Sequence, residues 1–492
     1  MKYLLGVDFG GGASKATLLS TDGVIVATNS VEYPSHYPQA GYVEQNPQDW
    51  YDATKENIAA LLKKSAVNPT DILAVSFDAA THTAVLLDDD FNVVRPSIYW
   101  SDSRATKESA YLRENYKDLI LSQALHSPDT IWTLPQLMWL RDNQPDVWQK
   151  VTRILFPKDY VRYLFTGVYC TDYIEAEGSM LFDFNTLSWS PELCSLLGFD
   201  IQKLPPVVAP TDIVGTVTAA AAADTGLAEG TKVVCGTTDT AMEVFASGAV
   251  AKGNCSVKLA TAGRICVVTD KAFPDRDIIN YSHVVKGLWY PGTATKACAS
   301  SYRWYRDTFG GDYKDLDKAA AAVPVGSEGL IYHPYINGEL TPYADPLLCG
   351  SFTGIRSGHT KGHFSRAVME GVAMSLIDSA KVVERLGITH DDHATIIGGG
   401  AYSPIWRQIV SDALNLELRL NENSDSSFGT AMLAGVAVGA FDSFEGVIRK
   451  CAKTVAVNTP NPENTKKYAE LFETYKAIHD ALAPVYHERA AK

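Results

Sequence analysis

One local pattern occurs twice in this chain and limits the folds that are open to it. An apolar strand, a turn of small residues and a second strand cover residues 3–20, where the turn is Gly10-Gly11-Gly12. The pattern returns at residues 256–269, where the turn is Ala260-Thr261-Ala262-Gly263. Small residues between two such runs predict a β-hairpin. The recurrence suggests two related halves. The alternative is chance, because any two hairpins with small turns look alike.

Length and composition agree with large domains of mixed structure. The chain has 492 residues, of which 46% are hydrophobic and 20% are charged. At roughly 150 residues per domain, this length predicts two to four domains or two large ones. The composition excludes global disorder, because disorder requires few apolar groups and a high charge density.

Charge, cysteines and hydropathy indicate a cytoplasmic protein. The net charge of −14 argues against nucleic acid or an anionic membrane as the main partner, because both bind clustered Lys and Arg. The eight cysteines are scattered and none forms a C-x-x-C pair, so we expect buried thiols rather than disulfides or a zinc site. Asp8 interrupts the apolar run Tyr3–Val7, and no apolar run of about 18 residues follows. We therefore expect neither a signal peptide nor a membrane partner.

Strands and helices alternate beyond the first hairpin. Asn46-Pro47 predicts a helix start, because Asn caps a first turn and Pro fits the first helical position. Residues 105–205 have a mainly helical pattern. The other expected elements are strands at Val24–Thr28, Ile72–Phe77, Ala84–Leu87 and Val233–Val234, then a helix over His363–Arg385, a strand over Ala394–Ile397, a helix over Ser427–Gly439 and a charged helix over Pro462–Lys492.

An aspartate stands at the end of the first strand, close to the glycine turn. Asp8 could hold Mg²⁺ there, directly or through water. The N–H groups of Gly10 and Gly11 could line a phosphate site, because glycine lets a ligand approach the backbone. Lys15, on the returning strand, could reach a phosphate. The alternative is a plain hairpin turn with a surface aspartate.

Three glycines follow an apolar strand in the second half of the chain. Gly398-Gly399-Gly400 precedes a helix that begins near Ser403, and such a turn admits a flat ligand against bare backbone. It matches neither G-x-G-x-x-G nor the Walker A motif, since no G-K-[ST] follows. The alternative is a sharp strand-to-helix turn without a ligand.

One carboxylate follows an apolar strand among small hydroxylated residues, in the sequence Cys235-Gly236-Thr237-Thr238-Asp239-Thr240. Asp239 suits a general base, which must lie within reach of a substrate hydroxyl. The alternative is an N-cap for a helix that begins at Ala241.

Two short segments that lie near each other in the chain suit a polyol. Thr81-His82-Thr83 and Trp100-Ser101-Asp102-Ser103-Arg104 offer hydrogen-bonding groups and an aromatic face. Each has a structural alternative as well. His82 could be a histidine of the core, and Asp102 and Arg104 could form a local ion pair.

In this order along the chain, the motifs resemble the FGGY carbohydrate kinases, and among them the xylulokinases, over nearly the whole length. The resemblance implies an α/β protein of two domains with the actin-like ATPase (ribonuclease H-like) fold and the active site in the interdomain cleft. An N-terminal domain over residues 1–245 would bind the sugar and carry the catalytic base, and a C-terminal domain over residues 246–492 would bind the nucleotide. The matching stretches are Gly6–Gly10, Arg95–Arg104, Pro157–Gly167 with Thr171-Asp172, Asn337–Tyr343, Arg366–Ala373 and Gly398–Ser403.

The resemblance also implies a reaction and its residues. The γ-phosphate of ATP would pass to a hydroxyl of a small sugar, with D-xylulose giving D-xylulose 5-phosphate and Asp239 as the catalytic base. Sugar, ATP and ADP would be the partners, and a homodimer is the commonest assembly for such enzymes. The expected residues are Thr81, His82, Trp100, Asp102, Arg104 and Asp239 for the sugar, Asp8, Gly10, Gly11, Lys15, Thr261, Gly263, Gly399, Gly400 and Ser403 for the nucleotide, and Asp8 and Asp239 for Mg²⁺.

Four motifs depart from the family's pattern. Gly11 replaces the Thr of Asp-x-Gly-Thr, and Ala260-Thr261-Ala262-Gly263 replaces Gly-Thr-Ser-Gly, but both turns stay small, so we expect ATP binding to survive. Leu340 replaces the Arg of Gly-Glu-Arg-Thr-Pro. Ala80-Thr81-His82-Thr83 replaces Gln-Met-His-Gly and alters the sugar pocket, which leaves ribulose, a tagatose-like ketohexose, erythritol or glycerol open as substrates. A nucleotide-binding scaffold without catalysis is the alternative from another class.

Overall fold

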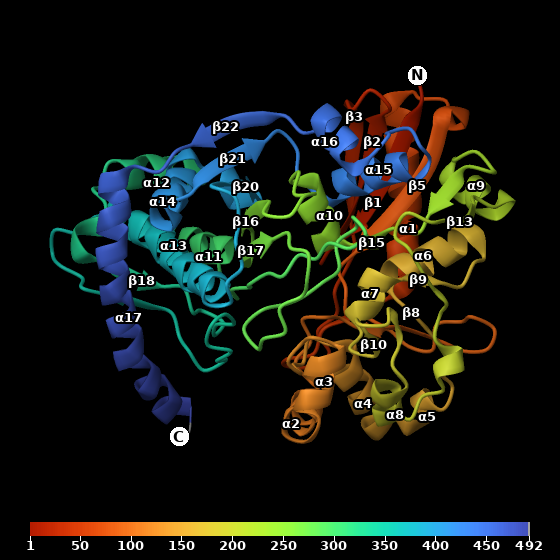
Figure 1. The fold of residues 1–492 in the computed structure, drawn as a ribbon, viewed down its shortest axis with the longest axis horizontal. Coiled ribbons are helices and arrows are strands. Elements are labelled where there is room, and N and C mark those ends of the chain that lie inside the picture. The colour runs from red at the N-terminus through yellow and green to blue at the C-terminus, as the bar shows by residue number, and fades with distance from the viewer. Residues whose placement is uncertain (491–492) are drawn as a thin grey trace. The chain divides into compact units, whose positions relative to one another are not determined.

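The computed structural model describes residues 1–490 and divides into two compact units (Figure 1). The first unit consists of Met1–Ala246, Tyr281–Gly287 and Ser424–Ala452. The second unit consists of Ser247–Asn280, Leu288–Asn423 and the residues from Lys453 onward. The boundary expected after residue 245 differs by one residue from the end of the first unit's N-terminal segment, and two later segments also belong to that unit.

A mixed sheet forms the centre of the first unit. Its strands are β1 (Tyr3–Phe9), β2 (Ala13–Ser20), β3 (Ile25–Glu32), β5 (Ile72–Ala79), β13 (Ile213–Thr216), β14 (Lys232–Val234) and the short β15 (Thr237–Thr238). Their order is β13-β14-β5-β1-β2-β3, and β15 also pairs with β5. β1, β5 and β14 are parallel, whereas β2, β3 and β13 pair antiparallel with their neighbours.

Helices and short strands make up the rest of the first unit, and residues 105–205 are mainly helical, as expected. The helices are α1 (Pro47–Ser65), α2 (Thr106–Asn115), α3 (Lys117–Gln123), α4 (Thr133–Asn143), α5 (Pro145–Trp148), α6 (Pro157–Thr166), α7 (Tyr173–Glu177), α8 (Pro191–Leu197), α9 (Ala219–Thr225), α10 (Asp239–Ala246), α15 (Ser426–Ala437) and α16 (Phe444–Cys451). The short strands are β4 (Glu44–Gln45), β6 (Val85–Leu87), β7 (Ser97–Ile98), β8 (Arg153–Leu155), β9 (Thr171–Asp172), β10 (Phe182–Asp183), β11 (Ser188–Trp189) and β12 (Val207–Val208).

Two helices cover the faces of the main sheet. α1 begins at the expected cap Asn46 and buries Trp50 and Leu61 against the sheet. α15 packs on β1, β2 and β5, and the Thr17 and Ser427 hydroxyls hydrogen-bond between β2 and this helix at 2.7 Å. Because successive side chains of a strand point to opposite faces, Leu5 of β1 joins the core that contains Trp50, whereas Leu4 lies beside Gly435 of α15.

The second unit has a sheet of its own with helices packed against it. Its strands follow the order β17-β16-β20-β21-β22. They are β16 (Cys255–Leu259), β17 (Gly263–Val267), β20 (His393–Ile397), β21 (Glu417–Asn421) and β22 (Thr454–Asn458), with the pair β18 (Ile331–His333) and β19 (Ser351–Thr353) apart. The helices are α11 (Ala299–Phe309), α12 (Tyr313–Ala321), α13 (Lys361–Arg385), α14 (Pro404–Leu414) and α17 (Pro462–Ala490), so the last two residues of the expected C-terminal helix lie outside the described part.

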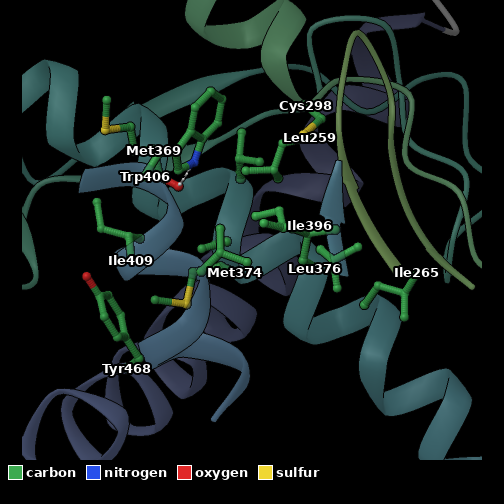
Figure 2. Packing of buried hydrophobic residues seen from close by; sticks show 14 of the residues in the cluster. Leu259, Ile265, Cys298, Met369, Met374, Leu376, Ile396, Trp406, Ile409 and Tyr468 are labelled. Atoms are coloured by element: carbon green, nitrogen blue, oxygen red, sulfur yellow. Dashed lines mark hydrogen bonds between the residues drawn. The ribbon is translucent and has the colours of Figure 1, made fainter. Parts of the chain in front are cut away.

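A continuous apolar core fills the second unit (Figure 2). Residues of β16, β17 and β20 pack against residues of α13 and α14. The Trp406 indole donates a hydrogen bond to the carbonyl oxygen of Met369 at 3.2 Å, which satisfies the one polar atom of this large side chain within the core. Core residues labelled in the figure include Leu259, Ile265, Met374, Leu376, Ile396, Ile409 and Tyr468.

The two sheets repeat the same arrangement of strands. In the first unit, β1 pairs antiparallel with β2 and parallel with β5, β5 pairs parallel with β14, and β14 pairs antiparallel with β13. In the second unit, β16, β17, β20, β21 and β22 show the same sequence of directions. The recurrence of hairpins in the sequence therefore reflects a recurrence of topology.

Two expectations from composition concern burial and membranes. Seven of the eight cysteines are buried, as expected for small apolar side chains, and only Cys349 is exposed. Within residues 1–490, no helix combines the length and the apolar character needed to cross a bilayer.

Candidate active site

Two carboxyl groups lie side by side at the carboxyl ends of neighbouring parallel strands in the first unit. Asp8 of β1 and Asp78 of β5 are paired in the register of these strands. Asp78 is fully buried and Asp8 is half-buried. The Thr430 hydroxyl of α15 donates a hydrogen bond to Asp78 Oδ2. Oδ1 of each aspartate is shielded from solvent and accepts no hydrogen bond from the described residues, so two carboxyl oxygens remain to be satisfied here.

Burial and like charge raise the pKa of both carboxyl groups. For Asp8, burial raises the pKa to about 7, the charges of Asp239 and Glu243 add to the rise, and hydrogen bonds with Asp78 and Ser426 oppose it. For Asp78, burial again has the largest effect, the charge of Asp8 follows, and the pKa lies well above its usual range. Near neutral pH the pair therefore retains a proton unless a cation offsets its charge.

Asp239 reaches the same edge of the sheet because the chain turns sharply before it. Gly236 has a φ of 75°, and a Cβ built on it would lie 1.8 Å from the Phe77 carbonyl oxygen, so glycine is required. β15 then pairs with the end of β5, and α10 begins at Asp239. The Thr238 hydroxyl accepts a hydrogen bond from Ala241 N at 3.3 Å, so the capping role left open for Asp239 is filled by its neighbour.

These carboxylates fit a magnesium ion that arrives with a nucleotide. Within residues 1–490, no group of three or more His, Cys, Asp or Glu side chains is arranged to hold a metal ion by itself. Mg²⁺ usually binds one or two carboxylates together with waters and substrate phosphates. The unsatisfied Oδ1 atoms of Asp8 and Asp78 suit that pattern, and the charge of half-buried Asp239 acts on Asp8.

The glycine turn after β1 is an exposed loop with firmly held carbonyl groups. Gly10 N donates to Ala13 O at 3.0 Å. Gly11 O accepts hydrogen bonds from Gln45 Nε2 at 3.0 Å and from Ser35 Oγ at 3.2 Å. Gly11 itself is exposed and has no side chain, so its backbone is accessible to a phosphate.

Lys15 lies opposite Asp8 in the register of β1 and β2. Its Nζ pairs with Asp425 Oδ2 at 3.1 Å, and Asp425 caps α15 by accepting a hydrogen bond from Phe428 N. The Lys15 side chain is 39% exposed. Its ammonium group is therefore engaged by the residue that caps α15. To bind a phosphate, it would have to give up the ion pair with Asp425 or contact both groups at once.

The two central residues of the expected sugar motif are held by groups from other elements. Thr81 Oγ1 donates to Glu175 Oε1 at 2.8 Å, and His82 Nε2 lies 2.5 Å from the Tyr281 hydroxyl. His82 has a φ of 71°, which residues other than glycine rarely adopt, and its carbonyl oxygen accepts a hydrogen bond from Thr133 Oγ1 at 2.8 Å. Backbone strain of this kind gathers at functional sites.

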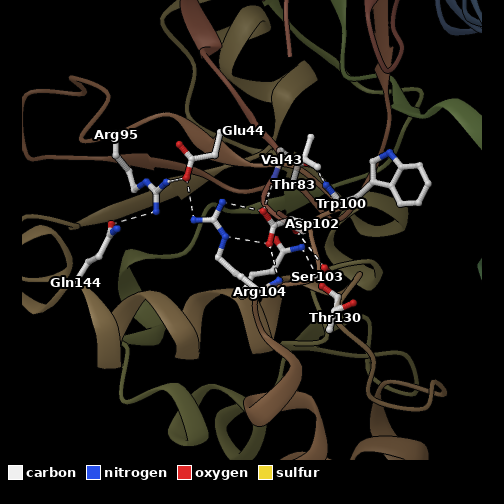
Figure 3. Close-up of polar contacts among 12 residues, drawn as sticks. Val43, Glu44, Thr83, Arg95, Trp100, Asp102, Ser103, Arg104, Thr130 and Gln144 are labelled. Carbon is white, nitrogen blue, oxygen red and sulfur yellow. Dashed lines mark hydrogen bonds and ion pairs between the residues drawn. The ribbon is translucent and has the colours of Figure 1, made fainter. Parts of the chain in front are cut away.

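Asp102 and Arg104 form the local ion pair that the sequence left open (Figure 3). Arg104 Nε and Nη2 donate to Oδ1 and Oδ2 of Asp102 at 2.9 and 2.7 Å. Val43 N donates to Oδ2 as well, at 2.6 Å, and Arg104 pairs with Glu44 at 2.8 Å. The charged atoms of both residues are therefore bonded to each other and to the surrounding protein.

Trp100, which was expected to contact the sugar, has an exposed aromatic ring. Its side chain is 40% exposed, and its backbone N donates to Thr83 Oγ1 at 3.1 Å. The ring of buried Tyr99 lies 5.9 Å from the Trp100 ring. Burial and the charges of Asp239 and Asp8 raise the pKa of Tyr99, so this segment runs close to the acidic edge of the sheet.

The expected phosphate turn of the second unit rests on the start of α11. Thr261 O accepts hydrogen bonds from Cys298 N at 2.9 Å and from Ser300 Oγ at 2.8 Å. Gly263 is buried, and its N donates to Thr295 Oγ1 at 2.9 Å. Thr261 itself is exposed at the turn, whereas Gly263 supports the turn from inside.

The residues of the triple-glycine motif have different environments. Gly399 is exposed, and a Cβ built on it would have no described atom within 4 Å. Gly400 is buried, and its Cβ would lie 3.0 Å from the Trp406 ring. Ser403 caps α14 by accepting a hydrogen bond from Trp406 N at 3.3 Å. Gly399 thus leaves its backbone exposed to solvent, while Gly400 and Ser403 stabilise the local fold.

Sequence reasoning missed three candidates. Asp78 lies in an apolar strand, and its partnership with Asp8 follows only from the parallel pairing of β1 and β5. Tyr281 comes from a distant part of the chain and left no local signal. Tyr402 is 63% exposed, and an aromatic residue just after a glycine turn was a signal that could have found it.

Known proteins resemble the chain over nearly its whole length. Residues 3–246 match the N-terminal domain of the FGGY family of carbohydrate kinases, and residues 232–438 match the C-terminal domain. The chain is 34% identical to the xylulose kinase of Bacillus subtilis (strain 168) over 487 residues, 97% of each protein. The crystal structure of xylulose kinase from Rhodospirillum rubrum has a TM-score of 0.90 at 28% identity and covers 99% of this chain and 100% of that one. The crystal structure of gluconate kinase from Lactobacillus acidophilus has a TM-score of 0.92 at 27% identity over 99% of each chain.

Proposed function

Because the chain belongs to the FGGY family of carbohydrate kinases and is an ATP-dependent sugar kinase, we propose that it phosphorylates D-xylulose to D-xylulose 5-phosphate. The gathering of Asp8, Asp78 and Asp239 at one edge of the sheet is the observation that carries the catalytic part. The identity to a protein named xylulose kinase, 34% over 97% of the chain, supports the substrate.

Asp239 acts as the general base in this proposal. Its carboxylate accepts the proton of the sugar hydroxyl while the hydroxyl oxygen forms a bond to the γ-phosphorus, and the bond from that phosphorus to the oxygen bridging to the β-phosphate breaks to release ADP. The transition state of such a transfer is loose, so orientation and charge compensation matter more than bond-making power. Asp239 is half-buried, and the Thr238 hydroxyl rather than the Asp239 carboxylate accepts the hydrogen bond from Ala241 N near the start of α10.

Asp8 and Asp78 would hold Mg²⁺ in this proposal, because the Oδ1 atom of each has no hydrogen-bond partner among the described residues. When bound, the ion supplies positive charge against the phosphates. Within the first unit, the proposed phosphate contact is the exposed backbone of Gly11, and within the second unit it is the exposed turn residue Thr261. Gly399, with open space at its α-carbon, accommodates the adenosine.

Gluconate is the second candidate substrate, because a solved gluconate kinase has the same fold at 27% identity. The carboxylate of gluconate would require a cationic side chain that is not already paired with an acidic one. Three buried cations of the first unit are committed to ion pairs, since Arg104 pairs with Asp102, and Lys158 and Arg162 pair with Asp159. This charge balance favours a neutral ketose.

A coupled assay of ADP release tests the proposal across D-xylulose, D-ribulose, D-tagatose, erythritol, glycerol and gluconate. We expect kcat/KM for D-xylulose to exceed the others by about tenfold or more, a difference of about 1.4 kcal/mol in transition-state binding. ³¹P NMR of the product should show a phosphate ester on C5. A higher kcat/KM for another substrate would overturn the assignment of xylulose, and ADP release that no sugar stimulates would favour a scaffold.

We also propose that the enzyme is a cytoplasmic homodimer. Scattered, mostly buried cysteines suit a reducing compartment, and two-fold dimers are the commonest assembly of soluble enzymes. Cell fractionation and light scattering on the purified protein test the two parts separately.

A further inference from the structure

A short segment of the chain's second half belongs to the first unit. Tyr281–Gly287 is assigned to the first unit, although the residues before and after it belong to the second. Ser282 anchors the segment, because its N and Oγ donate to Oε2 and Oε1 of Glu177 at 2.9 and 2.5 Å. Glu177 lies in α7 and is fully buried. The Tyr173 hydroxyl of α7 adds a contact to the His283 carbonyl oxygen at 3.4 Å.

This anchored segment places one tyrosine on the histidine of the sugar motif. The Tyr281 hydroxyl lies 2.5 Å from His82 Nε2, and the two rings are stacked with an interplanar angle of 16°. Trp132 lies on the imidazole as well, with its ring centroid at 4.3 Å. Gly178 permits this approach, since a Cβ there would lie 2.9 Å from His82 Cδ2 and 3.1 Å from the Tyr281 hydroxyl.

A hydrogen bond at one imidazole nitrogen determines whether the other nitrogen donates or accepts a hydrogen bond. In a neutral histidine one ring nitrogen donates and the other accepts, and the partner of the first fixes the role of the second. Tyr281 is 3% exposed and His82 is 7% exposed, so neither group can replace this bond with bulk water. Removal of the tyrosine oxygen would leave a buried ring nitrogen without this partner, which is costly and frees the ring to reorient.

We propose that Tyr281 is a positioning residue for the sugar: its hydroxyl fixes the orientation and tautomer of the His82 imidazole, and through it the hydroxyl pattern that the sugar must present. This inference rests on the proposed role of His82 in sugar binding. Sugar recognition would then depend on the segment Tyr281–Gly287, which lies far in sequence from His82. The chemistry recognised is a neutral polyol, whose hydroxyls can either donate to or accept from the imidazole.

The test is Tyr281→Phe, with Tyr173→Phe as the matched control. Both changes remove one hydroxyl that contacts this region, but only Tyr281 bonds the imidazole. We expect Tyr281→Phe to raise the KM for D-xylulose on the order of tenfold, with the KM for ATP changed less than about twofold. The ¹⁵N chemical shifts of the His82 ring should report a change of tautomer or a mixture of tautomers. Tyr173→Phe should change none of these quantities, and the melting temperature confirms that each variant is folded.

Two further variants separate this inference from the function on which it rests. His82→Ala should raise the KM for sugar, and adding Tyr281→Phe to it should produce no further rise, because coupled residues are not additive. If His82→Ala leaves the KM for sugar unchanged, the proposed sugar site fails, and this inference fails with it. If His82→Ala raises that KM while Tyr281→Phe does not, only the inference is overturned. An equal rise of both KM values in Tyr281→Phe, or unchanged ¹⁵N shifts of His82, would also overturn it.

Discussion

Asp8 and Asp78 are paired across two parallel strands, so two carboxyl groups share one buried edge of the central sheet. Like charges so close resist simultaneous ionisation, and burial adds to the effect. The pair is therefore a cost to the folded state whenever no cation is present. The loss of stability depends on pH, and its direction follows from the raised pKa values of the two carboxyl groups.

The first prediction concerns stability against pH in Asp78→Asn. The pKa of Asp8 is raised from 3.8 to about 7 in the folded protein, so the folded state binds more protons than the unfolded state between these values. Stability is therefore lost as the pH rises through this window, and the full cost is present above it. Asn at position 78 removes one charge and can donate to Asp8. We expect the variant to melt higher than wild type at pH 8 in EDTA, by about 2–4 °C for each kcal/mol recovered, with the difference shrinking toward pH 4.

Thermal melts across this pH range are the measurement, and Asp22→Asn is the control. Asp22 is exposed in the turn before β3, so its replacement should shift the melting temperature little at any pH. Mg²⁺ with a nucleotide should raise the melting temperature of wild type above pH 7 more than that of Asp78→Asn. A difference between wild type and Asp78→Asn that stays constant with pH would contradict the shared carboxyl site.

The second prediction concerns the rate of Asp239→Asn. Asn keeps the size and polarity of the side chain but cannot take a proton, so kcat should fall by about 10²–10⁴-fold while both KM values change modestly. The melting temperature should stay near that of wild type, because the Thr238 hydroxyl caps α10. Thr238→Ala should show the reverse pattern: kcat stays near that of wild type, and the free energy of unfolding falls by about 1 kcal/mol. A kcat within about threefold of wild type in Asp239→Asn, far below the usual range for a general base, would remove Asp239 from this role.

The resemblance to the FGGY carbohydrate kinases predicted the fold class, and the match to a solved xylulose kinase structure confirms it. Both hairpins, the cap at Asn46 and the long helix α13 follow from short-range signals of period and turn chemistry. Nothing local indicates that Ser424–Ala452 belongs to the first unit, because that assignment depends on which sheet α15 covers.

Some residues of the candidate site also have a local signal in the sequence, and others do not. Asp8 and Asp239 were found because each ends an apolar strand at a turn of small residues. Asp78 and Tyr281 were missed because their partners, Asp8 and His82, come from strand register and from a segment distant in sequence.

The third prediction separates the two glycines of the nucleotide motif. A Cβ on Gly399 meets no described atom within 4 Å, so Gly399→Val should fold normally and raise the KM for ATP about tenfold by blocking the adenosine, with the KM for sugar unchanged. A Cβ on Gly400 would press on the Trp406 ring at 3.0 Å, so Gly400→Ala should cost about 1–3 kcal/mol of stability through overpacking. Calorimetric titration with ATP and thermal melts distinguish the two effects. Normal ATP affinity in folded Gly399→Val would make the motif only a turn.

The last prediction concerns Asp102, which the sequence suggested for the sugar. Arg104 and Val43 N occupy both of its carboxylate oxygens, and the Asp102 and Arg104 side chains are 0% and 1% exposed. Removing one partner of a buried pair leaves an uncompensated charge and typically costs about 3–5 kcal/mol. Asp102→Ala should therefore lower the free energy of unfolding by about this amount.

The matched control is Asp142→Ala, which breaks a surface pair with Arg141 at 2.7 Å, where Asp142 is 50% exposed, and should cost less than about 1 kcal/mol. Urea denaturation measures both losses. Folded Asp102→Ala should also keep the ratio of its KM values for sugar and ATP, because a residue bonded only to protein atoms acts on both substrates alike. A wild-type stability together with a raised KM for sugar alone would show that Asp102 contacts the substrate and that the ion pair opens when the sugar binds.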